Sequence, residues 1–363
     1  MKSKSVLQGD QPAVPDTGRR RFLRESATMV AGAILLEPSQ NASAAEAESR
    51  GRETAETGTV ARKSFGRTGI QLSLFGIGGY HLGSVPTQEE ANRLVSEAID
   101  HGINFFDNAW EYHEGKSEEV MGKALLGKRD KIFLMTKVCT HGRDKSIAMK
   151  QLEDSLRRLK TDHLDLWQVH EVIYENDPDL HFAKGGVIEA LAQAKKEGKT
   201  RFVGFTGHKS PAIHLKMLSH DFPFDSVQMP LNCFDATYRS FEQTVLPEVM
   251  RRGIAALGMK SLGGDGQPLL HGVVTVEEAL RYAMSLPVAT TICGVDSLSV
   301  LRQNLTVARN FTPLSPKEMD QLRQRCAPFA ADGHLELYKS TKKYDADVGR
   351  EQHGYPSQEK LPV

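Results

Sequence analysis

Polar residues of four different chemistries stand at or near the ends of short apolar runs along the chain. Asp107, Lys137 and His170 each end such a run, and Tyr112 follows Asp107 by five residues. Reduction of a carbonyl group by hydride leaves an alkoxide, so a proton donor must stand within hydrogen-bond reach of that oxygen. A phenol, an ammonium, a carboxylate and an imidazole form a set that could supply and tune such a donor.

Each member of this set has a role that follows from its chemistry. Tyr112 is the candidate proton donor, and lowering the pKa of a free phenol from about 10 to about 7 takes roughly 4 kcal/mol. A neighbouring ammonium in a partly dry site can supply this stabilisation, which makes Lys137 the candidate cation. A buried lysine needs a carboxylate to stay charged, and Asp107 is placed to provide it. His170 would hydrogen-bond the substrate oxygen. Any one of them alone is more easily explained as a structural ion-pair partner, so the hypothesis depends on the set.

The runs that carry these residues alternate with amphipathic segments, which is the pattern of repeated βα units around a parallel sheet. Eight units predict a single (β/α)8 TIM barrel over residues 60–330, where reacting groups come from the C-terminal ends of the strands. An open doubly wound sheet is the competing architecture, but residues 76–80 (GIGGY) lack the G-x-G-x-x-G pattern of a dinucleotide-binding turn. The predicted strands are 71–77, 103–108, 131–138, 163–169, 200–206, 225–230, 254–259 and 289–294.

Helices are predicted between these strands. Residues 88–101 place apolar side chains at i, i+3 and i+4 spacing, and Thr87 with Glu90 forms the sequence pattern of a capping box. Thr275 with Glu278 repeats that pattern. Three glycines follow helical runs and precede strands, as C-terminal caps do: Gly102, Gly198 and Gly253.

Three motifs in this arrangement resemble the aldo-keto reductases. They are F-F-D-N-A-x-x-Y at residues 105–112, M-T-K-V at 135–138 and D-L-x-x-x-H at 165–170. The likeness covers about residues 62–325, and each motif falls on the strand that the family requires. It implies a nicotinamide-dependent oxidoreductase that interconverts aldehydes or ketones and alcohols. It also implies that the catalytic tetrad consists of Asp107, Tyr112, Lys137 and His170.

The resemblance further implies where the nicotinamide end of a cofactor would bind. Thr206 and Gln228 match in kind the residues that hold the carboxamide in the family. Gly207 stands where the family has an Asn, so either His208 substitutes for that amide or the contact is missing. In the loop after the seventh strand the family often stacks an aromatic ring on the nicotinamide, whereas this chain has Met259 followed by Lys260. Met259 would then provide a softer contact.

Lys260 lies where a contact to the pyrophosphate is expected, and Gln303 and Asn304 match the family's adenine-contacting Glu-Asn pair. The family usually prefers NADPH and grips its 2′-phosphate with a Lys or Arg. Here Asp296 would repel a phosphate and suits a ribose 2′-hydroxyl, while Arg302 offers a rescuing charge. We therefore expect NADP as the cofactor, with NAD as a close second.

The first 44 residues resemble a twin-arginine export signal. Residues 19–24 (RRRFLR) match the R-R-x-F-L-K pattern with an Arg in place of the Lys. The apolar run 27–36 spans roughly 15 Å, about half of a bilayer core, so it is too short for stable membrane insertion. Residues 42–44 (ASA) have the A-x-A form of a signal peptidase site. We expect cleavage there, residues 45–59 as a linker, the twin-arginine export machinery as a partner and a periplasmic location. A disordered basic N-terminus is the alternative.

Composition restricts the remaining possibilities. The chain has 363 residues, 39% hydrophobic and 25% charged, with 46 Lys+Arg against 46 Asp+Glu. The zero net charge argues against nucleic acid as a partner, and a mean hydropathy of −0.39 excludes a multi-pass membrane protein. The four cysteines are scattered singly, so no metal site is expected. Residues 331–363 show no periodicity and are predicted to be a C-terminal tail that either folds over a barrel face or stays loose.

Three other functions compete with the reductase as explanations of these residues. A nucleotide-binding sensor or partner-binding barrel with negligible turnover is the main alternative, because the carboxamide site departs from the family pattern. A Schiff-base lyase would use Lys137 but leaves Asp107 and Tyr112 without a task. A metallohydrolase is disfavoured because no H-x-H or His/Asp cluster ends the first predicted strand.

Overall fold

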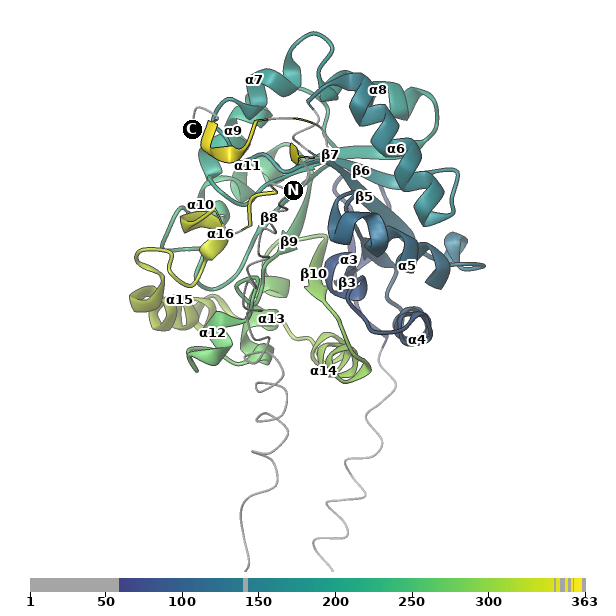
Figure 1. Cartoon of the computed structure of the whole chain (residues 1–363). Coiled ribbons are helices and arrows are strands. Elements are labelled where there is room, and N and C mark those ends of the chain that lie inside the picture. Colours follow the sequence, from purple (N-terminus) through teal and green to yellow (C-terminus); the bar gives the residue numbers. More distant parts are fainter. Residues whose placement is uncertain are drawn as a thin grey trace, which may run out of the picture. The chain divides into compact units, whose positions relative to one another are not determined.

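The computed structural model describes residues 59–139, 143–342, 344–346, 350, 351, 354 and 356–360. Eight parallel strands form a closed barrel with the order β10-β3-β4-β5-β6-β7-β8-β9 (Figure 1). The prediction of a (β/α)8 barrel is thereby confirmed. The barrel strands are β3 (Phe75–Gly78), β4 (Phe105–Asp107), β5 (Phe133–Cys139), β6 (Leu164–His170), β7 (Thr200–Thr206), β8 (Ser226–Pro230), β9 (Ala255–Met259) and β10 (Thr290–Gly294).

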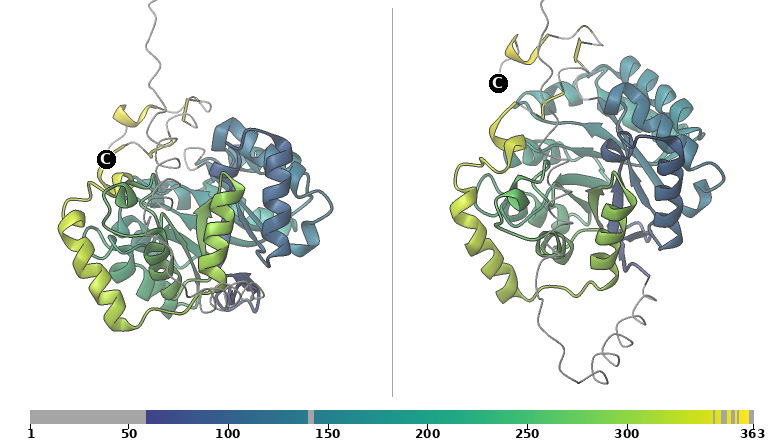
Figure 2. Two further views of the ribbon diagram at one scale, coloured as in Figure 1. Left: turned by 90° about the horizontal axis from the view of Figure 1, so that it is seen from below. Right: turned by 60° about the horizontal axis from the view of Figure 1, so that its bottom comes forward.

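Helices surround the barrel, as two further views show (Figure 2). The longer ones are α4 (Gln88–Asp100), α5 (Lys116–Ala124), α6 (Lys145–Leu159), α8 (Val187–Lys196), α9 (Pro211–Ser219), α13 (Val276–Ser285), α14 (Leu298–Arg309) and α15 (Pro316–Ala330). Shorter ones are α3 (Gly79–Leu82), α7 (Asp177–Phe182), α10 (Phe241–Thr244), α11 (Leu246–Arg251), α12 (Gln267–Leu270) and α16 (Leu337–Ser340), with 3-10 turns at Tyr112–Gly115, Arg129–Lys131 and Gln358–Lys360. None of the helices within the described ranges is long and apolar enough to cross a membrane.

The predicted helix caps are found in the structure, with one exception. Thr275 and Glu278 form a complete capping box at the start of α13. At α4 only half of the box is present, because Thr87 accepts a hydrogen bond from the backbone N–H of Glu90 without the reciprocal bond. The three predicted capping glycines all adopt positive φ: Gly102, Gly198 and Gly253.

The predicted strand 71–77 is wrong as a single element. Its first part is β2 (Gln71–Ser73), which pairs antiparallel with β1 (Arg62–Ser64), a strand that the sequence analysis missed. The chain then enters the barrel as β3. Phe65 and Leu72 from this hairpin are fully buried against Phe105, Phe133 and other barrel residues. The hairpin thus closes one end of the barrel with apolar side chains. The sequence does not reveal where β2 ends and β3 begins, because the apolar run continues while the strand changes its pairing partner.

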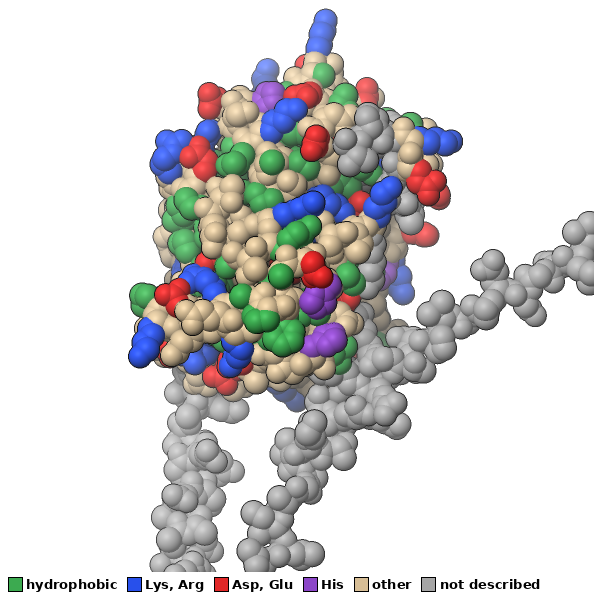
Figure 3. Space-filling view, turned by 90° about the vertical axis from the view of Figure 1, so that its left-hand side faces the viewer, with side chains coloured by type: hydrophobic (Ala, Val, Ile, Leu, Met, Phe, Trp, Pro, Cys, Tyr) green, Lys and Arg blue, Asp and Glu red, His purple; other side chains and the backbone are tan. Residues whose placement is uncertain are grey.

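Most core residues lie between the strands and the surrounding helices, where they form one large apolar cluster. On the face seen in Figure 3, hydrophobic side chains are interspersed with charged ones of both signs. The barrel therefore provides a rigid frame whose C-terminal strand ends can hold polar groups in fixed positions. The predicted signal segment 1–44 and residues 45–58 of the predicted linker lie outside the described residues.

Candidate active site

Lys137 is the centre of the predicted catalytic set. Its ammonium donates to Asp107 Oδ1 at 2.5 Å and to the backbone carbonyl of Asn108 at 2.8 Å. A third contact, at 3.3 Å, reaches Tyr112 Oη. The structure therefore brings together three of the four predicted residues through one buried cation.

This ion pair is held by neighbouring barrel strands and is dry. Asp107 ends β4 and Lys137 lies in the adjacent β5, and their side chains are 5% and 1% exposed. Burying two charges is unfavourable unless each is paired and hydrogen-bonded. The contacts of Lys137 with Asp107 and with the Asn108 carbonyl meet that condition. The pair consequently holds the Lys137 ammonium in a fixed position beside the phenol.

The expectation that the pKa of Tyr112 falls to about 7 is wrong for this structure. Burial raises the pKa of Tyr112 well above its ordinary value, and the carboxylates of Asp107, Glu111 and Glu171 raise it further. The Lys137 ammonium does not offset these effects, because Asp107 already pairs with it. Tyr112 is therefore a neutral phenol at physiological pH, which is the state required of a proton donor.

His170, at the end of β6, is the fourth member of the set and also lies near the phenol. Its ring lies 5.8 Å from the Tyr112 ring, with the two planes at 87°. Its Nδ1 makes a short hydrogen bond with Oε1 of Glu111, the residue before Tyr112. Although burial opposes the shift, the charge and hydrogen bond of His170 lower the pKa of Glu111. Glu111 is therefore an ionised partner of His170.

The turn that carries Tyr112 has an unusual backbone for its sequence. His113 and Glu114 have φ values of 52° and 57°, and Gly115 has 90°. These two non-Gly residues adopt the left-handed conformation that Gly adopts freely. His113 Nε2 contacts the Tyr80 carbonyl at 2.7 Å, which fixes the turn against α3.

Thr206, at the end of β7, pairs with Gln228, in the middle of β8, so the two lie side by side as the expected carboxamide site requires. Both are almost fully buried. Within the described part of the chain, Thr206 Oγ1 and Gln228 Oε1 have no hydrogen-bond partner. Buried polar groups without partners are costly, so these atoms fit a polar ligand such as an amide.

The structure favours the second of the two expectations for position 207, that the amide contact is missing. A side chain at Gly207 would bring Cβ to 2.4 Å from the Val172 carbonyl, so an Asn does not fit there. His208 does not substitute for it. Its Nε2 makes a short hydrogen bond with Glu171, and its Nδ1 lies 3.0 Å from the carbonyl of Tyr338. Both ring nitrogens are therefore engaged within the protein.

Lys260 directly follows β9, at the C-terminal ends of the barrel strands, and the C-terminal tail covers it. Its ammonium sits 4.5 Å from the ring centroid of Tyr344 and 5.8 Å from that of Tyr338. Burial lowers the pKa of Lys260 to about 8. Met259 lies beside the expected carboxamide site, because its sulfur is 3.7 Å from Gln228 Nε2.

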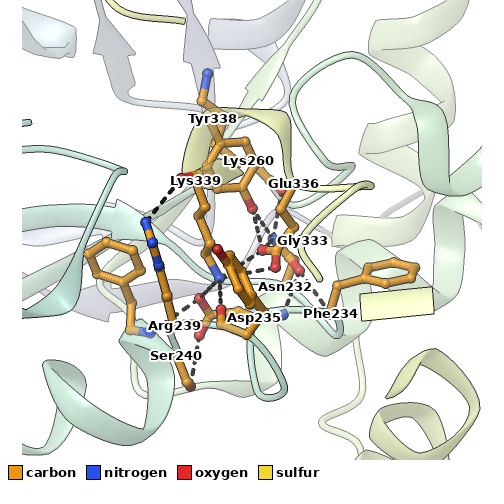
Figure 4. Close-up of polar contacts among 12 residues, drawn as sticks. Asn232, Phe234, Asp235, Arg239, Ser240, Lys260, Gly333, Glu336, Tyr338 and Lys339 are labelled. Atoms are coloured by element: carbon orange, nitrogen blue, oxygen red, sulfur yellow. Dashed lines mark hydrogen bonds and ion pairs between the residues drawn. The ribbon is translucent and has the colours of Figure 1, made fainter. Parts of the chain in front are cut away.

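The tail is fastened by a buried polar cluster, drawn in Figure 4. Lys339, which is fully buried, donates to Asp235 at 2.6 Å and to Glu336 at 3.0 Å. Asn232 joins this cluster to the rim by donating to Tyr338 Oη at 2.9 Å and to the Lys260 carbonyl at 3.1 Å. Of the two expectations for residues 331–363, folding over a barrel face therefore holds for the part around α16.

The expected adenine contacts lie on α14, where Gln303 is exposed and Asn304 is buried. Arg302, the candidate residue for binding a 2′-phosphate, instead forms a bidentate ion pair with Glu97 of α4, at 2.7 and 2.9 Å. This pair is exposed and so costs at most about 1 kcal/mol to break. Among the described residues, no group of three or more His, Cys, Asp or Glu side chains could hold a metal ion.

A protein-family comparison agrees with this geometry. Residues 75–267 match the model described as the aldo/keto reductase family. The chain belongs to the aldo/keto reductase family. The expectation of an NAD(P)-dependent oxidoreductase is thereby confirmed at the level of the family.

Individual relatives within the aldo/keto reductase family are distant. The chain is 27% identical over 304 residues to the uncharacterized oxidoreductase YqkF of Bacillus subtilis, which covers 72% of this chain and 95% of that protein. The holo form of aldo-keto reductase AKR11C1 from Bacillus halodurans superposes with a TM-score of 0.62 at 25% identity, over 73% of this chain and 96% of that one. An aldo-keto reductase from Klebsiella pneumoniae in complex with NADPH has a TM-score of 0.59 at 22% identity, over 74% and 95%.

Two features of this aldo/keto reductase were missed by the sequence analysis. The partnership of Glu111 with His170 joins residues 59 positions apart, and no spacing rule indicates it. The cluster around Lys339 was missed because a few buried polar residues, without an apolar period, attach the tail. The available signal was a lysine and an acid in the tail and a second acid after β8.

Proposed function

We propose that this chain reduces small aldehydes or ketones to alcohols, or catalyses the reverse reaction, with Tyr112 as the general acid or base. The observation that carries the proposal is the single buried ammonium of Lys137, which contacts the Asp107 carboxylate and the Tyr112 hydroxyl together. This arrangement supplies a neutral phenol backed by a fixed cation beside the strand ends of the barrel.

The residues of the chain then have distinct tasks. A bound nicotinamide cofactor would supply the hydride. Tyr112 gives its proton to the carbonyl oxygen as negative charge develops there, and Lys137 stabilises the phenolate that forms. Asp107 keeps Lys137 charged and in place. His170 holds the carbonyl oxygen in the position from which it can accept the Tyr112 proton.

NADP is the cofactor that best suits this proposal. The Klebsiella relative is in complex with NADPH. In this chain Thr206 and Gln228 would hold the carboxamide, Lys260 the pyrophosphate, and Gln303 with Asn304 the adenine. NAD remains the second candidate, because Asp296 is acidic and Arg302 is paired with Glu97. Fluorescence titration of the protein with NADPH and NADH tests this choice, and tighter binding of NADH would reverse it.

Turnover on a panel of aldehydes and ketones, followed by NADPH absorbance, tests the reaction. We expect consumption of NADPH with at least one carbonyl class. A nucleotide-binding sensor or partner-binding barrel is the second candidate, favoured by the missing amide at Gly207 and the engaged His208. NADPH that binds tightly without exchange, together with no turnover on the whole panel, would support the sensor.

We also propose that the chain is exported to the periplasm by the twin-arginine route. The RRRFLR motif, the short apolar run and the ASA sequence support this proposal. Replacing Arg19 and Arg20 by Lys in the full chain should leave the protein uncleaved in the cytoplasm, whereas the unaltered chain should be cleaved after Ala44. Equal export of both chains would refute it.

A further inference from the structure

Glu111, which pairs with His170, is built into the active site without a task in the reaction so far described. The side chains are 9% and 12% exposed and are joined through Glu111 Oε1 and His170 Nδ1. Glu111 directly precedes Tyr112, and His170 stands edge-on to the Tyr112 ring. Any change in the protonation of Glu111 or His170 therefore takes place next to Tyr112, the proton donor.

Hydrogen-bond accounting restricts the state of this pair. The pKa of Glu111 is lowered, so its carboxylate accepts and does not donate. His170 Nδ1 must then carry a hydrogen. A neutral imidazole has only one N–H, so a neutral His170 would present a bare, accepting Nε2 to the substrate. A bare Nε2 cannot donate to a carbonyl oxygen, which is also an acceptor. Only the doubly protonated ring can do so.

We infer that Glu111 is a positioning residue that keeps His170 as a doubly protonated imidazolium, so that Nε2 donates a charge-assisted hydrogen bond to the substrate carbonyl. This inference rests on the proposed carbonyl chemistry. Charge-assisted hydrogen bonds are shorter and roughly twice as strong as neutral ones. The carbonyl oxygen would thus meet two donors, the neutral phenol of Tyr112 and the cationic ring of His170.

The charged groups around His170 are compatible with this state. Glu111 faces it from the loop after β4, and Tyr112 faces it from the following turn. Glu171 follows it in the chain and pairs with His208 on the other side. Lys137 reaches Tyr112 from β5, but its charge is compensated by Asp107. The nearest charge to the imidazolium is therefore the carboxylate of Glu111.

The test is a double-mutant cycle with Glu111→Gln and His170→Gln, with Glu114→Gln as the matched control. Glu114 is an exposed acid in the same turn, so its replacement removes the same charge without touching His170. At saturating NADPH we expect Glu111→Gln to lower kcat by about 10- to 100-fold. It should leave the Kd for NADPH unchanged. In the His170→Gln background the same change should cost less than about threefold.

The pH profile separates this role from a structural one. Without Glu111 the imidazolium is lost at a lower pH. The reduction rate of Glu111→Gln should therefore begin to fall at a pH at least one unit below that of the unaltered enzyme. Glu114→Gln should keep the original profile. The glutamine retains the shape of the side chain, so an effect confined to packing would not move the profile. Equal effects of Glu111→Gln in both backgrounds, or unchanged profiles, would overturn the inference.

Nitrogen-15 NMR of the histidine rings in the nucleotide-free protein decides the question without turnover. The signal of His170 is assigned by its absence from His170→Gln. We expect both of its nitrogens to be protonated at neutral pH in the unaltered chain and in Glu114→Gln, and the ring to be neutral in Glu111→Gln. A neutral His170 in the unaltered chain would refute the inference. Absence of turnover with every carbonyl would instead refute the proposed reaction and leave this result standing.

Discussion

Removal of one partner of the buried Asp107–Lys137 pair should lower both the stability of the fold and the rate of catalysis, and the two effects can be measured independently. The pair is 2.5 Å long with side chains 5% and 1% exposed, so Asp107→Asn leaves an ammonium that water cannot reach. Breaking a buried pair in this way costs about 3–5 kcal/mol of unfolding free energy. For a domain of this size, the Tm should fall by roughly 5 to 8 °C.

The double variant Asp107→Leu/Lys137→Met makes the prediction specific. It removes both charges. The buried Asn108 carbonyl then loses its Lys137 donor, which costs about 1–3 kcal/mol. The Tyr112 hydroxyl also loses Lys137, but this residue is only half-buried, so water can replace that contact. Urea unfolding should therefore show the double variant to be more stable than Asp107→Asn by about 2 kcal/mol. Carbonyl turnover should nevertheless be lost in both. The reasoning is refuted if Asp107→Asn unfolds like the unaltered protein, or if the double variant reduces carbonyls.

Three further predictions follow from the charges of the site. Because the pKa of Tyr112 lies well above 10, its proton should not limit reduction below that pH, and alcohol oxidation should still rise with pH near 10; a plateau of oxidation near pH 7 would contradict this. Because the pKa of Lys260 is about 8, the Kd for NADPH in fluorescence titrations should rise above pH 8, up to about tenfold per pH unit, and Lys260→Met should abolish that dependence; a persistent dependence would assign it elsewhere. Lys339→Met should lower the unfolding free energy in urea by about 3–5 kcal/mol, whereas exposed Lys342→Met should stay within about 0.5 kcal/mol, and equal effects would deny the buried cluster its role.

The sequence was sufficient to predict the barrel and the relative placement of the catalytic set. Alternating βα units place strand-end residues at one face, so the pattern alone predicts that Asp107, Lys137 and His170 meet there. The contacts of Lys137 confirm its meeting with Asp107 and Tyr112. The roles of these residues in turnover remain predictions.

Features that depend on distant side chains could not be predicted. The raised pKa of Tyr112 results from burial together with three carboxylates, of which only Asp107 was considered from the sequence. The engagement of His208 depends on Glu171 and on the tail carbonyl of Tyr338. Such contacts follow from loop paths, and local periodicity carries no information about them. The hairpin of β1 and β2 was missed for a related reason, since an apolar run does not reveal where its partner changes.

The central claim is that Tyr112 donates the proton while the neighbouring cation and the strand ends hold the reactants. Tyr112→Phe removes only the hydroxyl and keeps the ring, so it tests this claim most directly. Transient kinetics of NADPH oxidation with a reactive aldehyde should show a rate lower by about 100- to 10,000-fold, with unchanged NADPH affinity in a parallel titration. Turnover at the rate of the unaltered enzyme would contradict the account.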